Sequence, residues 1–261
     1  MSSQRLLNGF TGIFAVSCGV FLLSNLSVKV EAQPSSAAPR RESQKVAIRY
    51  RPPAGQGKPK ATVGGGTRTT CFLDEEQPKP PLTLLIPGEK LGLTTRQHPQ
   101  FFVYVPQTSA KEAEFLLRDA NGEYQYRARY SLPETSGIVK VELPDSATAL
   151  EEGKDYQWMF AIICDPDSRD RDVVDMGAIK LTELSPTQKS QLEQAEPLKR
   201  AALYAEYGIW HDAVETLASL QCSESNHQNQ ETWRQLLQSQ PLLDSIATQP
   251  LIECGTRKIT R

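Results

Sequence analysis

The stretch "LEEGKDYQWMFAIIC", residues 150–164, decides the fold class. Beyond its glycine turn, large apolar side chains occupy every second position, so they fall on one face of an extended strand. Aromatic residues in that pattern are typical of a strand that fills the interior between two sheets. The stretch therefore predicts a central strand with one fully buried face, formed by Tyr156, Trp158, Phe160 and Ile162.

Short alternating segments of the same kind surround this strand, and turn residues separate them. Asn121-Gly122 lies between two of the segments and is a strong hairpin signal. Leu150 stands six residues before Tyr156, which resembles the corner of immunoglobulin-like and fibronectin type III domains, where the tyrosine hydroxyl bonds upstream backbone. An antiparallel β-sandwich is expected, with the other strands at 82–87, 101–106, 113–119, 124–130, 137–143 and 173–181.

Helical signals begin at "LSPTQKSQL", residues 184–192. Ser185 is a suitable N-cap, and Gln188 completes a capping box. Residues 197–220 then predict two closely packed helices that join at Gly208, similar to one tetratricopeptide unit. Residues 231–250 add further helices. The fold class is therefore mainly β with α: a sandwich followed by a small C-terminal helical cap.

The N-terminal residues predict export. An uncharged run, residues 9–28, precedes small residues that end at Ala32, which favours a cleaved signal peptide, although the run could instead remain as a membrane anchor. No later window is apolar enough for a membrane span. The expected organisation is a signal peptide 1–32, a basic Pro/Gly-rich disordered linker 33–66, a β-sandwich 67–184, a helical cap 185–254 and a tail 255–261.

Charge is unevenly distributed along the chain. Residues 33–69 carry a net charge of +7, and residues 70–261 carry −10. A basic arm of this composition cannot bury enough surface to fold and is expected to be a solvated tether. An exported, acidic body makes nucleic acid a poor partner.

Four cysteines follow the signal segment, and an even number in an exported chain indicates two disulfides. Three pairings are possible. We expect Cys71–Cys164 and Cys222–Cys254, because each then closes within one region of the chain. None of the four lies in a CxxC pair, so the sequence gives no support for a redox or zinc site.

Two loops have an amino-acid composition that could suit a ligand site. The glycine run "GGGTR", residues 64–68, lacks the lysine of a phosphate-binding loop and precedes acidic, Pro-rich sequence, so we expect it to be only a flexible entry to the sandwich. The loop "CDPDSRDRDVVD", residues 164–175, is a weak metal candidate, but its arginines offset the charge and we expect a solvated hairpin. We expect no cofactor. The carboxylates of that loop are Asp165, Asp167, Asp170 and Asp172.

Catalytic signatures are absent from the sequence. His98, His211 and His227 are the three histidines, and none accompanies a GxSxG or HExxH motif. We expect no catalytic residues and a protein that is not an enzyme, although a hydrolase site assembled from distant residues stays open.

Several motifs together resemble a cyanobacterial exported family that is catalogued only as a domain of unknown function. They span about residues 63–254. Thr69 departs from the pattern, where a glycine is expected after the arginine. The resemblance implies a periplasmic or surface location in a cyanobacterium. It implies no ligand and no catalytic residue. The motifs are "GGGTR" followed by Cys71, "FFVYVP", "AEFLLRD", "YQWMFAIICD", "LYAEYGIWHDAVETLASL" and "WRQLL".

The function expected from the sequence is that of an exported, non-catalytic module that binds an unidentified envelope protein. Tyr207 and Trp210, in the "YGIW" turn, are candidate partner contacts, although both rings could instead pack the cap onto the sandwich. The alternatives are a module that binds cell-surface polysaccharide and, less favoured, a hydrolase. A polysaccharide binder would show exposed, coplanar aromatic rings on a sheet face. A hydrolase would show a deep pocket with a histidine. A protein-binding module would show an apolar patch beside the cap.

Overall fold

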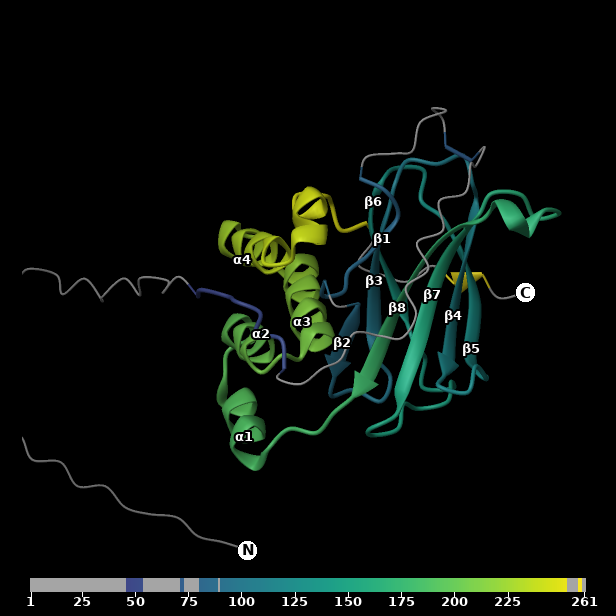
Figure 1. Cartoon of the computed structure of the whole chain (residues 1–261). Coiled ribbons are helices and arrows are strands. Elements are labelled where there is room, and N and C mark those ends of the chain that lie inside the picture. The colour runs from purple at the N-terminus through teal and green to yellow at the C-terminus, as the bar shows by residue number, and fades with distance from the viewer. Residues whose placement is uncertain (1–45, 54–70, 73–79, 89, 253–257, 260–261) are drawn as a thin grey trace, which may run out of the picture. The chain divides into compact units, whose positions relative to one another are not determined.

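The computed structural model describes residues 46–53, 71–72, 80–88, 90–252 and 258–259 (Figure 1). The predicted signal peptide, its alternative as an anchor, and the glycine run lie outside these residues. The strands of the described residues are β1 Thr83–Leu84, β2 Leu91–Thr94, β3 Gln100–Val105, β4 Glu112–Asp119, β5 Tyr124–Ser131, β6 Gly137–Glu142, β7 Asp155–Ile163, β8 Val173–Leu181 and β9 Lys258–Ile259.

These strands form two mostly antiparallel sheets, which confirms the predicted sandwich. One sheet has the order β1-β3-β6, and the other has the order β2-β8-β7-β4-β5-β9. The chain passes between the sheets after β1, β2, β3, β5 and β6, and crossings of this kind occur in the Greek-key connections of immunoglobulin-like domains. All seven predicted strands are present. The sequence did not predict β2, which runs parallel to β8 at the edge of the larger sheet, or the two-residue β9.

The tyrosine corner forms as predicted. The Tyr156 hydroxyl accepts a hydrogen bond from the backbone N–H of Glu151 at 3.0 Å. Leu150 is fully buried beside it and forms part of the sandwich core. This local contact fixes how the chain enters β7, so the alternating aromatic residues of that strand all face the interior.

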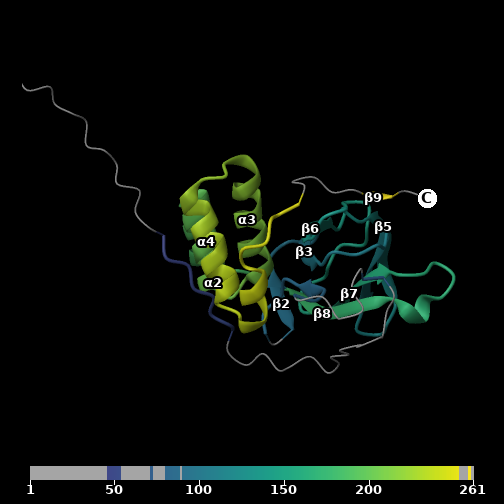
Figure 2. The same cartoon turned by 90° about the horizontal axis from the view of Figure 1, so that it is seen from above.

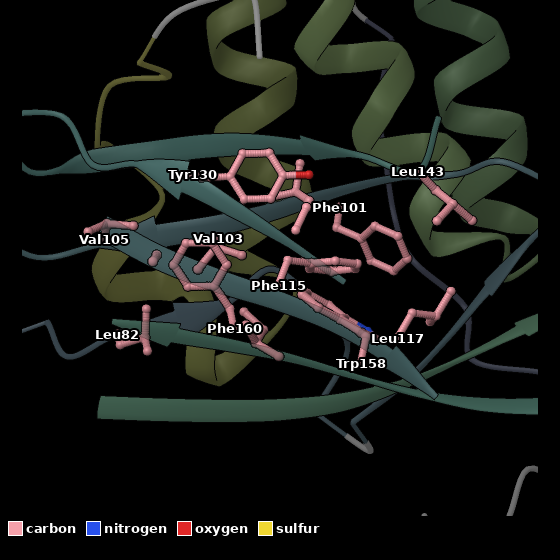
Figure 3. Packing of buried hydrophobic residues seen from close by; sticks show 14 of the residues in the cluster. Leu82, Phe101, Val103, Val105, Phe115, Leu117, Tyr130, Leu143, Trp158 and Phe160 are labelled. Atoms are coloured by element: carbon pink, nitrogen blue, oxygen red, sulfur yellow. The ribbon is translucent and has the colours of Figure 1, made fainter. Parts of the chain in front are cut away.

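Aromatic side chains from both sheets meet in the sandwich core (Figure 3). The ring of Phe101, on β3, lies 4.7 Å from that of Trp158 and 4.9 Å from that of Phe115, measured between centroids. All three side chains are at most 1% exposed. Because burying one such side chain contributes about 1.5–3 kcal/mol, this cluster is a major source of the sandwich's stability.

The helices follow the sandwich, and the first three begin where the sequence predicts, whereas the fourth begins at His227, before the predicted start at residue 231. Ser185 caps α1 through a complete capping box with Gln188. Gly208 separates α2 from α3 and adopts a φ of 77°, a left-handed conformation that glycine accepts without strain. The helices are α1 Pro186–Gln194, α2 Pro197–Glu206, α3 Trp210–Ser223 and α4 His227–Gln238, with short 3-10 helices at Arg169–Arg171 and Pro241–Ile246.

The helical cap packs on the outer face of the three-stranded sheet, so that sheet lies between helices and the second sheet (Figure 2). Phe102 and Tyr104 of β3 contribute to the cap cluster, while Phe101 and Val103 point the other way, into the sandwich. Successive side chains of β3 therefore point alternately into two hydrophobic cores. For this reason almost every residue of the strand is apolar.

Trp210 is buried in the cap cluster and is not a surface residue. Its side chain is fully buried, packs edge-on against Tyr50, and donates a hydrogen bond from Nε1 to the carbonyl of Leu85 at 2.8 Å. The candidate role of Trp210 as a partner contact is therefore wrong, because the ring has no exposed surface. Tyr207 is partly exposed, and its hydroxyl donates a hydrogen bond to Gln191.

Part of the predicted disordered linker is ordered. Within residues 46–53, Ile48 and Tyr50 are buried in the cap cluster, and the N–H of Arg51 donates to the carbonyl of Ala205 at 3.0 Å. The assignment of all of 33–66 as disordered linker is therefore wrong for this segment. The sequence predicted disorder here because of the basic residues of the segment. Its apolar side chains nevertheless alternate with Arg49 and Arg51, so one face packs on the cap while the charged groups stay in solvent.

Candidate functional site

A buried acid on α3 fastens the cap to the sandwich. Asp212 is 1% exposed and accepts three hydrogen bonds from the end of β2 and the turn that follows it. The Thr94 hydroxyl donates at 2.7 Å, the Thr95 hydroxyl at 2.5 Å and the Thr95 N–H at 3.1 Å. Burial raises the pKa of Asp212, and these hydrogen bonds oppose the rise. Because every contact holds the turn, we interpret Asp212 as a structural clamp.

Glu215 lies one helical turn after this clamp, in the same seam between cap and sandwich. Its side chain is 10% exposed and lies 3.2 Å from the Nε of Arg96. Burial raises the pKa of Glu215 to about 7, because solvent screens the half-exposed Arg96 and Asp212 adds a nearby negative charge. Arg96 also lies 4.0 Å from Asp212. One arginine therefore faces two buried carboxyl groups, and its single positive charge cannot balance both of them.

His211 is a core residue. Its ring is 2% exposed and packs edge-on against Phe101 and Trp158. Burial lowers the pKa of His211 to about 3, so the ring is neutral. The absence of a side chain at Gly92 makes room for it, since a Cβ there would lie 2.5 Å from His211 Nε2. Enclosed by aromatic rings, His211 has no access to a substrate.

A groove of about 550 Å³ lies beside α4, and we call it the cap groove. Its walls are α4 and the chain that follows the last 3-10 helix. Trp233 is one of its lining residues and is largely buried, with its ring packed edge-on against Phe102. The lining is mixed, with apolar, amide, hydroxyl and charged side chains: Gln221, Ser225, His227, Gln230, Glu231, Trp233, Arg234, Ala247, Thr248, Gln249, Pro250 and Leu251.

A smaller pocket of about 310 Å³ adjoins the cap groove and shares Leu251 with it. It lies between α3 and the outer face of the three-stranded sheet. Lys140 and Gln100 line it and both contact Glu142, at 2.5 and 3.3 Å. The two hollows together follow the junction between cap and sandwich.

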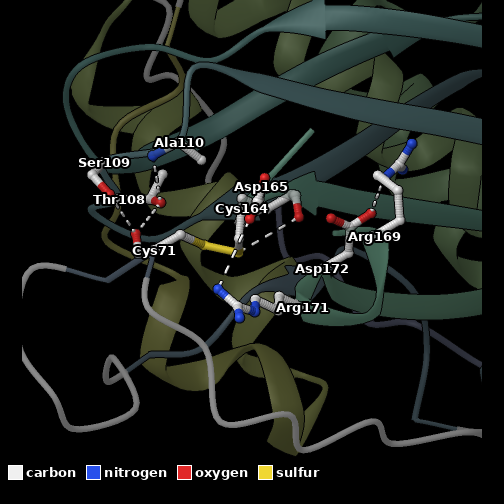
Figure 4. The surroundings of a disulfide bond; sticks show 10 residues. Cys71, Thr108, Ser109, Ala110, Cys164, Asp165, Arg169, Arg171 and Asp172 are labelled. Carbon is white, nitrogen blue, oxygen red and sulfur yellow. Dashed lines mark hydrogen bonds and ion pairs between the residues drawn. A yellow bond between two sulfur atoms is a disulfide. The ribbon is translucent and has the colours of Figure 1, made fainter. Parts of the chain in front are cut away.

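The acidic loop after β7 is a hairpin held by arginine contacts (Figure 4). Arg169 donates to Asp172 at 2.6 Å and to Glu114 at 3.1 Å, and Arg171 lies 3.9 Å from Asp165. The other two candidate ligands, Asp167 and Asp170, are exposed in the same loop. Within the described ranges, no group of three or more His, Cys, Asp or Glu side chains is placed to hold a metal ion.

The cysteines form the first predicted bridge. Cys71 and Cys164 are joined in a disulfide, which ties the chain before β1 to the end of β7 (Figure 4). Cys71 is buried, and its carbonyl accepts a hydrogen bond from the Thr108 hydroxyl at 2.5 Å. Cys222 is also disulfide-bonded. Cys254, its predicted partner, lies outside the described residues.

The sequence analysis did not find the cap groove, the Asp212 clamp or Glu215. His227 was named only as one of three histidines, and it now lies on the groove wall. The one available signal was the spacing of His227, Gln230, Glu231 and Arg234, which places them on one face of a helix. That spacing could not show that a second wall faces them.

The fold defines the class of protein, an immunoglobulin-like β-sandwich with a helical cap on one sheet. More particularly, the chain belongs to the family described as Domain of Unknown Function (DUF928), whose model matches residues 63–251. No curated protein and no solved structure matches the chain. In the described part of the chain, no helix has the length and apolar character needed to cross a bilayer.

Proposed function

We propose that this protein is an exported, non-catalytic module that binds another protein of the cell envelope through the cap groove. The cap groove carries the proposal. Its lining combines apolar and polar side chains and includes Trp233 and Arg234, and tryptophan and arginine are residue types that often dominate binding energy. The Cys71–Cys164 disulfide supports an oxidising location outside the cytoplasm.

A polysaccharide-binding module is the second candidate, because five groove residues carry amide or hydroxyl groups that could bond sugars. The sheets give it less support. Among the described residues, Tyr124 is the one exposed large aromatic side chain, and Arg118 covers its ring at 4.4 Å from the centroid. A flat platform of several rings is therefore lacking there.

A hydrolase has weaker support still. The cap groove does hold His227, as a hydrolase would require. Glu231, one turn further along α4, bonds instead to Arg234 and Gln235. Among the described residues no hydrogen bond joins His227 to a serine, threonine or cysteine, so the nucleophile and base pair that such chemistry needs is missing from this part of the chain.

Capture from envelope extracts tests the proposal. The oxidised protein would be immobilised beside a Gln230→Trp variant, which fills the groove from an exposed position on α4, and a Gln194→Trp variant, which adds the same ring on the exposed surface of α1. We expect a defined protein to bind the parent and the Gln194→Trp variant and to be lost with Gln230→Trp. Retention by all three proteins, or of polysaccharide alone, would overturn the assignment.

A further inference from the structure

A short extended segment forms the second wall of the cap groove and pairs with the edge of the three-stranded sheet. The N–H of Ile138, on β6, donates to the carbonyl of Pro250 at 2.8 Å, and the N–H of Ile252 donates to the carbonyl of Ile138 at 2.8 Å. Ile138 and Leu251 thus form a parallel bridge. Residues 250–252 act as an added edge strand beside β6.

In this register, the backbone N–H and C=O of one residue of the edge strand point away from β6. Successive residues of a strand direct their N–H and C=O groups to opposite sides. Because Pro250 and Ile252 both bond toward β6, the N–H and C=O of Leu251 point away from it. Within the described part of the chain, neither group has a backbone partner. Leu251 also lines the cap groove, so the open strand edge lies beside that groove.

The opposite wall of the cap groove, formed by α4, carries almost no net charge. An uncharged peptide would therefore suit it better than a charged one. Glu231 and Arg234 form an ion pair at 2.5 Å and so largely cancel one another. The remaining polar side chains of the lining are amides, hydroxyls and the imidazole of His227, and the amides and hydroxyls both donate and accept. Trp233 and Leu251 supply apolar surface between the two walls.

We propose that the cap groove binds an extended, uncharged polypeptide segment of the partner protein, which adds as a strand beside Leu251. This inference rests on the proposed function and names the kind of partner. The N–H and C=O of Leu251 hydrogen-bond to the incoming backbone, and an apolar side chain of the segment lies against Trp233. An extended peptide repeats its donor and acceptor at the spacing of the strand edge, whereas a saccharide offers hydroxyl groups at a different spacing.

The test begins with a phage-displayed library of random linear peptides, selected on the immobilised, oxidised full-length protein. The Gln230→Trp variant serves as the counter-selection and Gln194→Trp as the matched control. We expect enriched peptides to bind the parent and the control and to lose binding to Gln230→Trp. Titration of an enriched peptide into labelled protein should move the amide proton of Leu251 downfield, because that group gains a hydrogen bond.

A pair of substitutions at the edge isolates the backbone contact. Leu251→Pro removes the outward N–H while leaving the two groups that bond Ile138, and Leu251→Val keeps the N–H. Exchange protection of the Ile138 amide reports whether the edge strand persists in both variants. We expect Leu251→Pro to weaken peptide binding about tenfold, as expected for loss of one buried hydrogen bond, and Leu251→Val to retain it.

The outcomes separate the two proposals. If Gln230→Trp blocks the peptides but Leu251→Pro does not and the Leu251 amide does not shift, strand addition is overturned and the groove assignment stands. If peptides bind regardless of Gln230→Trp, or if none is enriched and maltohexaose or chitohexaose shifts the groove amides instead, both proposals fall.

Discussion

Replacing Glu215 with glutamine should stabilise the protein above pH 7 and change its stability far less near pH 4.5. The side chain is 10% exposed, and burial raises its pKa from 4.5 to about 7. Below pH 4.5 the carboxyl is protonated in both the folded and unfolded chains. Between pH 4.5 and about 7 the unfolded chain releases this proton while the folded protein retains it, so stability falls across this range and levels off once the folded carboxyl ionises.

The size of the effect follows from the two pKa values. Each pH unit between them is worth about 1.4 kcal/mol, so ionised Glu215 costs the folded state about 3 kcal/mol above pH 7. Glutamine does not titrate. The free energy of unfolding of the Glu215→Gln variant, relative to the parent, should therefore rise by about 3 kcal/mol from pH 4.5 to above 7.

The difference between variant and parent is the useful quantity, because other groups titrate too. Burial lowers the pKa of His211 from 6.5 to about 3, so His211 removes stability as pH falls below 6.5. That contribution opposes the one from Glu215 in the parent protein, but it is common to both chains and cancels in the difference.

Urea unfolding followed by tryptophan fluorescence would measure these free energies in steps across the pH range. A Glu193→Gln variant, changed on the exposed face of α1, provides the control and should show a difference that is flat with pH. The reasoning fails if the Glu215→Gln difference is equally flat. It also fails if that variant is the less stable protein above pH 7, which would mean that the ion pair with Arg96 outweighs desolvation.

Three further changes test the packing, capping and crosslinking of the fold. Gly92→Ala should destabilise the protein by about 1–3 kcal/mol in urea, because its Cβ would meet the buried ring of His211 at 2.5 Å, whereas Gly88→Ala, with a nearest contact at 3.8 Å, should change little. Ser185→Ala should cost about 1 kcal/mol of local stability and speed amide exchange in the first turn of α1, with other helices unaffected. Cys71→Ser should lower the free energy of unfolding by about 2–5 kcal/mol, because the bridge spans 93 residues; an unchanged midpoint under non-reducing conditions would contradict it.

Local signals predicted most of the secondary structure. Alternation placed the seven main strands, the Leu150–Tyr156 spacing predicted the corner, and Ser185 and Gly208 marked helix boundaries. Each signal acts over a few residues, through side-chain direction, a cap or a permitted φ. The sequence therefore suffices for these features without knowledge of what they pack against.

The candidate site depends on contacts between distant segments. Asp212 meets Thr95 across 117 positions, and Trp210 meets Leu85 across 125. Nothing in "YGIW" distinguishes a ring on the surface from one buried in the cap cluster, and nothing in residues 46–53 identifies the cap as their partner.

The sequence by itself determined a sandwich with a helical cap, because periodicity and turn residues act locally. Only the tertiary structure decided that Trp210 is buried, that Glu215 is desolvated, and that α4 and Leu251 face one another across a groove. Burial and proximity arise from how the elements pack, and that packing is set by many weak contacts summed over the whole chain.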